Sequence, residues 1–185
     1  MISDIWLQFI DLALQIPPSH PYQDSLISIL HELTKLPCRS NRPEAELKEI
    51  EKFSGRFWDL LPMFKWTVLE CWWKAPWEED PEVLALASRR NMMAFARWSA
   101  KEWTNINAFV ARVTASELLS GVTFERVALQ VLNHALEVER RVDGLDDNLP
   151  PAAVWMLYAG RWIYGNEDDG EAVRGVAMGW ASQLV

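Results

Sequence analysis

Apolar residues recur every three or four positions along most of the chain, which is the spacing of amphipathic helices. Residues 3–16 show it first: a stripe of four polar side chains runs along an otherwise apolar segment that Pro17-Pro18 ends. Residues 22–36 repeat the pattern up to Pro37. No run alternates apolar and polar residues for long enough to predict a strand. The pattern therefore predicts an all-α protein.

Further helices are expected at 44–53, 63–74, 124–141, 152–164 and from 171 to the end. The span 82–120 has neither proline nor glycine, so it forms either one long helix or two. We divide it at Ser99, because Ser99-Ala-Lys-Glu102 matches a capping box. Residues 152–164 are apolar on nearly every side, which predicts a buried central helix. We expect one helical domain over 1–185, a bundle of about eight helices.

Length, composition and charge narrow the class of protein. Half of the 185 residues are hydrophobic, enough for one packed core. A net charge of −8, from 18 basic and 26 acidic residues, argues against a nucleic-acid partner. The longest apolar stretch, 150–160, is about half of the roughly 20 residues that a membrane span needs. The two cysteines cannot build a disulfide framework. We expect a cytoplasmic protein that has no membrane partner.

Several kinds of site are missing from the sequence. It has no glycine-rich phosphate loop, no nucleophile elbow and no zinc-ligand pair. The acidic runs 78–80 and 167–169 lie beside proline or glycine and are interpreted as solvated loops rather than magnesium sites. Cys71 is interpreted as a small core residue. We therefore expect no metal and no cofactor.

Three ionisable residues lie at or near apolar helix faces. Glu139 projects into the apolar arc of its helix, and Arg161 lies on a helix without a polar face. Buried charges are costly unless they are paired, so the two predict either a structural ion pair or acid–base groups in a cavity. Either side chain can also reach water through its long stem. His134, at the edge of the same arc, is either a satisfied edge histidine or a general acid or base.

The eleven tryptophans are the most unusual feature of the composition. Most must pack in the core, but indole rings also make flat walls for an apolar ligand. If a cavity exists, we expect it where 103–118, 124–141 and 152–164 meet. The candidate catalytic residues are then Glu139, His134 and Arg161, and the candidate ligand-binding residues are Trp103, Asn107, Trp155 and Tyr158.

Four stretches also carry a family resemblance. They are His20-Pro21-x-Gln23-Asp24, Trp58 to Pro62, Trp103-x-Asn105-x-Asn107-Ala-Phe109-x-Ala-Arg112-x-Thr114 and Pro151-Ala-Ala-x-Trp155-x-x-Tyr158-Ala-Gly160. In these the chain resembles a large family of uncharacterised helical proteins from filamentous fungi, catalogued as a domain of unknown function. The resemblance implies an all-α, cytosolic, fungal-type protein, and it associates the chain with secondary metabolism. It implies no reaction and no catalytic residues.

Two functional hypotheses follow. The first is the handling of a small apolar molecule in an aromatic-lined cavity, as a cofactor-free isomerase, cyclase or dehydratase. The second is a non-enzymatic helical interaction or scaffold protein. The oligomeric state is left open under both hypotheses, with a homodimer among the alternatives. A cavity with converging polar groups favours the first hypothesis. A filled core with an exposed apolar patch favours the second.

Overall fold

The computed structural model describes residues 2–36, 61, 63–72, 98–116, 124–136 and 145–165. These ranges contain six helices and no strand, which confirms the all-α class for this part of the chain. The helices are α1 (Ile2–Gln15), α2 (Tyr22–Thr34), α4 (Phe64–Trp72), α6 (Ala100–Ala115), α7 (Glu125–Leu136) and α8 (Leu145–Gly165). The helices predicted at 44–53 and from 171 onward, and nearly all of 82–98, lie outside the described residues.

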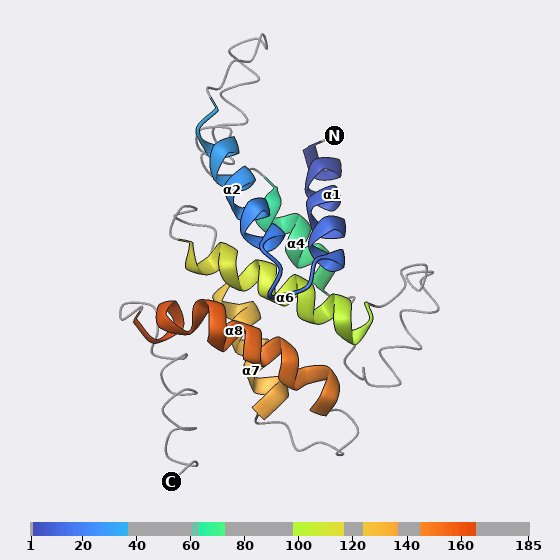
Figure 1. Ribbon diagram of the computed structural model, residues 1–185, viewed down its shortest axis with the longest axis vertical. Coiled ribbons are helices and arrows are strands. Elements are labelled where there is room, and N and C mark those ends of the chain that lie inside the picture. The colour runs from blue at the N-terminus through green and yellow to red at the C-terminus, as the bar shows by residue number, and fades with distance from the viewer. Residues whose placement is uncertain are drawn as a thin grey trace.

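Helix α6 is the central element. It crosses the middle of the molecule, with α1, α2 and α4 on one side and α7 and α8 on the other (Figure 1). Ten of its sixteen residues are buried, including the consecutive run Asn105 to Ala111. A helix buried on both sides must carry small or apolar residues around most of its circumference, and α6 does so with alanines, valines and phenylalanine.

The expectation of a buried central helix at 152–164 is wrong. Helix α8 packs one side against α6 and α7. Its other side is exposed, with Leu157 at 75% and Tyr164 at 73%. An apolar circumference was taken to mean burial on all sides, but it also fits a helix with one apolar face on the surface.

Helix α8 also begins earlier than expected. The sequence analysis expected this helix to start at residue 152, whereas it runs from Leu145 and contains both Pro150 and Pro151. A proline removes one backbone donor and strains the preceding turn, which can kink a helix without ending it.

The start of α6 confirms the division of the 82–120 span at Ser99. The Glu102 backbone N–H donates to Ser99 Oγ at 3.3 Å, and the Ser99 backbone N–H donates to Glu102 Oε2 at 2.8 Å. Both halves of the capping box are present. Two backbone donors that the helix itself cannot satisfy are thereby paired.

Ser99→Ala is expected to lower the free energy of unfolding by about 1 kcal/mol, because a capping hydroxyl is lost. The pKa of Glu102 lies below its ordinary value of 4.5, because the Ser99 side chain and then its backbone donate to the carboxylate. A carboxylate whose pKa is lowered by folding stabilises the folded protein at pH values above its unfolded-state pKa. This stabilisation is lost as the pH falls through the folded-state pKa. Urea denaturation should therefore show a smaller wild-type advantage at acid pH. Ser28→Ala, an exposed mid-helix change, is the control, and equal midpoints for wild type and Ser99→Ala at neutral pH would contradict the expectation.

Aromatic rings bind the layers together. Phe64 of α4 contacts Trp6 of α1 at 5.3 Å between ring centroids, and it contacts Phe109 of α6 and Phe124 at 6.3 Å each. All four rings are at most 2% exposed. The prediction that most tryptophans pack in the core is confirmed here for Trp6.

Candidate functional site

The end of α1 is held by two buried amides. Asn105 Nδ2 of α6 donates to the Leu14 carbonyl at 2.7 Å. Gln23 Nε2 of α2 donates to the Ile16 carbonyl at 2.8 Å and to the Asn105 carbonyl at 3.3 Å. The last carbonyls of a helix have no partner within it, so these amides satisfy groups that burial would otherwise leave unpaired. They hold the turn between α1 and α2, residues 16–21, against α6; we call this segment the α1–α2 turn.

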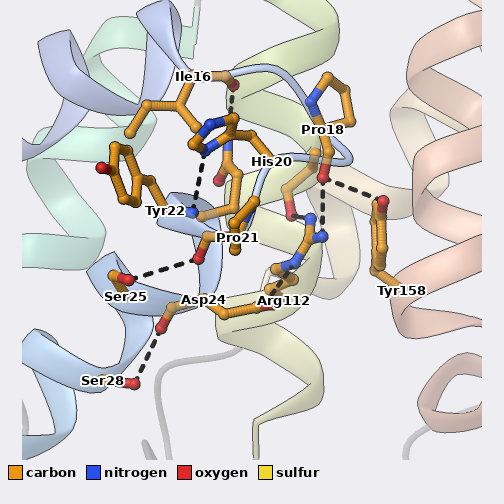
Figure 2. Close-up of polar contacts among 12 residues, drawn as sticks. Ile16, Pro18, His20, Pro21, Tyr22, Asp24, Ser25, Ser28, Arg112 and Tyr158 are labelled. Atoms are coloured by element: carbon orange, nitrogen blue, oxygen red, sulfur yellow. Dashed lines mark hydrogen bonds and ion pairs between the residues drawn. The ribbon is translucent and has the colours of Figure 1, made fainter.

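A second set of contacts holds the same turn from the other side (Figure 2). Arg112 Nη2 donates to the Pro18 carbonyl at 2.8 Å, and the Tyr158 hydroxyl donates to the same oxygen at 3.0 Å. Arg112 Nε also donates to Asp24 Oδ1 at 2.9 Å. The Arg112 guanidinium carbon lies 3.4 Å from the centroid of the Tyr158 ring. Arg112 of α6 and Tyr158 of α8 thus both donate hydrogen bonds to one backbone oxygen of the turn.

His20 completes the turn. Its Nδ1 accepts a hydrogen bond from the backbone N–H of Tyr22, the first residue of α2, at 3.2 Å (Figure 2). His20 thus helps to cap this helix, since it satisfies one of the free donors at the helix start.

Three of the predicted ligand-binding residues meet between α6 and α8. Trp155 Nε1 donates to Asn107 Oδ1 at 2.7 Å, and Asn107 Nδ2 donates to the Trp103 carbonyl at 2.8 Å. All three residues are 0% exposed. Their proximity was predicted from the sequence. The role predicted for them was to bind a ligand, whereas in the structure their polar atoms bond to one another.

The remaining predicted site residues do not join that group. Tyr158 contacts Arg112 and Pro18, on the side of the α1–α2 turn. His134 is half-buried on α7, and Glu139 lies outside the described residues. Arg161 is exposed, which contradicts the burial of its charge and agrees with the stated alternative that its long stem reaches water. Burial of Arg161 was expected because the whole helix was expected to be buried. Helix α8 instead has a solvent-exposed side, and Arg161 lies on that side. With Glu139 undescribed, their predicted ion pair stays a prediction.

A tryptophan cluster is a feature that the sequence analysis did not single out. Trp72, at the end of α4, lies 4.6 Å from Trp103 and 6.5 Å from Trp98 between ring centroids, and Trp98 stacks on Trp103 at 5.9 Å. Among the residues that the structure describes, no acceptor pairs with the buried Trp72 Nε1–H. A buried donor without an acceptor costs about 1–3 kcal/mol, so this atom is a place where a ligand acceptor would stabilise the fold. The sequence feature that points to this cluster is the position of Trp98 and Trp103 on either side of Ser99, the N-cap residue of α6.

The outer face of α8 is the second feature that sequence reasoning missed. By "outer face" we mean residues Leu149, Ala153, Met156, Leu157, Gly160 and Tyr164. Its four large side chains are exposed by 43% for Leu149, 53% for Met156, 75% for Leu157 and 73% for Tyr164. At 100° per residue the six positions share an arc of about 100°. A Cβ built on Gly160 would meet no atom within 4 Å, as expected of open surface.

The described residues contain neither a candidate metal site nor a candidate membrane-spanning helix. Among them, no three histidine, cysteine, aspartate or glutamate side chains are grouped so as to hold a metal ion. No helix in the described ranges is long and apolar enough to cross a membrane.

Comparison with known proteins identifies one family. No curated protein and no solved structure matches the chain. The sequence pattern of the family described as "Protein of unknown function (DUF3632)" matches residues 6–182. This range covers nearly the whole chain, and it includes all four stretches on which the resemblance rests. The chain is therefore a member of the DUF3632 family.

Proposed function

We propose that this protein is a non-enzymatic helical interaction module, and that it binds its partner through the outer face of α8. The observation that carries the proposal is the exposure of Leu149, Met156, Leu157 and Tyr164 on one side of one helix. Single exposed apolar residues are ordinary, but a continuous apolar stripe on a soluble surface marks an interaction site.

The internal contacts support the same proposal. Asn107 and Trp155 use their polar atoms on each other, and Arg112 and Tyr158 use theirs on the Pro18 carbonyl. Side chains in such contacts hold helices in place, and a ligand would have to compete with bonds already made. Asn107, Arg112 and Tyr158, which lie in the family-like stretches, thus hold α6, α8 and the α1–α2 turn together.

The energetics of the outer face favour binding of another helix. Fully burying an exposed leucine or methionine side chain contributes about 1.5–3 kcal/mol. Four such side chains in one stripe supply enough to offset much of the entropy lost on association. A helix that binds another helix contacts it through residues spaced at i, i+4 and i, i+7. The outer face has this spacing, with its residues at positions 149, 153, 156, 157, 160 and 164.

Leu157→Glu is the variant that tests the proposal. Wild type, tagged and expressed in its native cells, should migrate on native gels as an assembly larger than the monomer. Leu157→Glu should migrate as a monomer, because a charge at the centre of a buried apolar contact goes unpaired. The control is Leu12→Glu on α1, where the leucine is 49% exposed. Wild type at monomer mass, or an unchanged Leu157→Glu assembly, would contradict the proposal. Thermal melting of both variants should match wild type.

A second candidate function is the handling of a small apolar molecule, with isomerisation, cyclisation or dehydration as the reaction class. The specific observation in its favour is the Trp72 Nε1–H, which is buried beside Trp98 and Trp103 and has no acceptor within the described part of the chain. A flat apolar ligand with one acceptor atom would suit these groups. Native mass spectrometry of the purified protein should then find a bound metabolite that Trp72→Phe loses, with the exposed Trp66→Phe as control.

A further inference from the structure

We infer that the outer face of α8 binds the same face of a second copy of this chain, with the two helices antiparallel about a two-fold axis. The inference rests on the proposed function and names its partner. The axis passes between Met156 and Leu157, at the middle of the exposed stripe.

The spacing of the stripe is what points to a second copy. An antiparallel two-fold axis brings each residue opposite the one at the same distance on the other side of the midpoint. With the midpoint between Met156 and Leu157, Met156 faces Leu157 of the second copy. Ala153 then faces Gly160, and Leu149 faces Tyr164. All six residues of the outer face are paired with none left over, which is the self-complementarity that an isologous interface requires.

The sizes of the paired residues also match. Ala153 is exposed, and the open space beside Gly160 leaves room for a methyl group opposite it. Small residues opposite each other let two helix backbones approach closely. Leu149 and Tyr164, at the two ends of the stripe, then cover these points of close approach. The large residues thus lie at the centre and at both ends, and the small ones lie between.

Area and charge are consistent with a reversible dimer. The four large side chains expose on the order of 500 Å² per copy, so pairing removes about 1,000 Å² from water, the lower bound for specific interfaces. Between Asn148 and Tyr164 the sequence holds one charged residue, Arg161, and no acidic one. The face itself is therefore free of like-charge conflict between carboxylates. Each copy carries a net charge of −8, so salt should strengthen the dimer by screening repulsion between the two.

Sedimentation velocity of the purified chain over a range of concentrations tests the pairing. Wild type should pass from monomer to dimer as the concentration rises, at lower concentrations when salt is added. Leu157→Glu should raise the dissociation constant at least about 100-fold, which is the effect of losing one buried leucine. Leu12→Glu should leave it unchanged. A wild-type monomer at every concentration would overturn the inference. If native gels of cell extracts still show a Leu157-dependent assembly, the proposed function stands with another partner; if they do not, both fail.

Disulfide trapping tests the orientation. The double variant Ala153→Cys with Gly160→Cys should form a covalent dimer under mild oxidation, and peptide mass spectrometry should find the 153–160 link. Ala153→Cys alone should not cross-link, because in the antiparallel pair the two 153 positions lie about 10 Å apart along the axis. Wild type, with its native Cys38 and Cys71, is the control for background. Efficient cross-linking by Ala153→Cys alone would indicate a parallel pair and overturn the arrangement.

Discussion

Trp155→Ala is expected to lower the free energy of unfolding by about 3–5 kcal/mol, because it removes a large, fully buried ring between α6 and α8. The substitution also deletes the indole N–H that donates to Asn107 Oδ1 at 2.7 Å. A buried amide oxygen without a donor adds its own penalty of about 1–3 kcal/mol, so the effect should reach the upper part of the range.

Leu12 provides the control. It is 49% exposed on α1, away from the outer face of α8, so Leu12→Ala should change the stability by about 0.5 kcal/mol or less. Guanidinium denaturation followed by circular dichroism measures both variants. A Trp155→Ala midpoint equal to that of Leu12→Ala would mean that Trp155 is not a packing residue. Trp155→Phe keeps a smaller buried ring and loses the donor, so its loss of stability should lie between those of wild type and Trp155→Ala.

Arg112→Met is expected to destabilise the protein by about 2–3 kcal/mol, because charge-assisted hydrogen bonds and a cation–π contact are lost together. Arg112 donates to the Pro18 carbonyl and to Asp24, and it stacks on Tyr158. Its side chain is only 12% exposed, whereas that of Asp24 is 72% exposed, so most of the effect should come from Pro18 and Tyr158.

Arg161→Met is the control for Arg112→Met, with the same chemical change at an exposed position of α8. Because a surface side chain away from special contacts contributes little, this variant should stay within about 0.5 kcal/mol of wild type. The two melting curves should therefore be well separated. Equal losses in both variants would show that Arg112 does not fasten the α1–α2 turn.

Much of the helical architecture follows from local rules. Pro17-Pro18 ends α1 because a proline cannot continue a helix, and the Ser99–Glu102 pair marks the start of α6 because capping is a contact over three residues. Such features depend on neighbours in the chain, so a single sequence reveals them. The burial of Cys71 was predictable in the same way, from its place on an apolar helix face.

The placement of α8 was not predictable from local rules. Periodicity shows which positions are apolar, but not which of them meet another helix. For α8, Trp155 and Ile163 face the core, while the equally apolar Leu157 faces water. The same limit explains Arg161, whose burial was inferred from a helix that has an open side.

The candidate site was predictable only in part. The sequence placed Asn107 and Trp155 near each other, and they do meet. The bonds around Pro18 join residues 94 and 140 positions apart, and no sequence spacing points to such pairs. Within the family-like stretches, Asn107, Arg112, Trp155 and Tyr158 make contacts that join α6, α8 and the α1–α2 turn.

The central claim, that the outer face of α8 is covered by a partner when the protein works, is tested most directly by oxidation of Met156 relative to Met63. The two methionines are exposed to similar degrees in the chain alone, by 53% and 49%, and they lie on α8 and just before α4. Hydrogen peroxide oxidises methionine according to its exposure, and mass spectrometry of peptides from briefly treated native extracts reads both sites at once. The account predicts that Met156 oxidises at least about fivefold more slowly than Met63 in wild type, and at a similar rate in Leu157→Glu. Equal rates for Met156 and Met63 in wild type would contradict it.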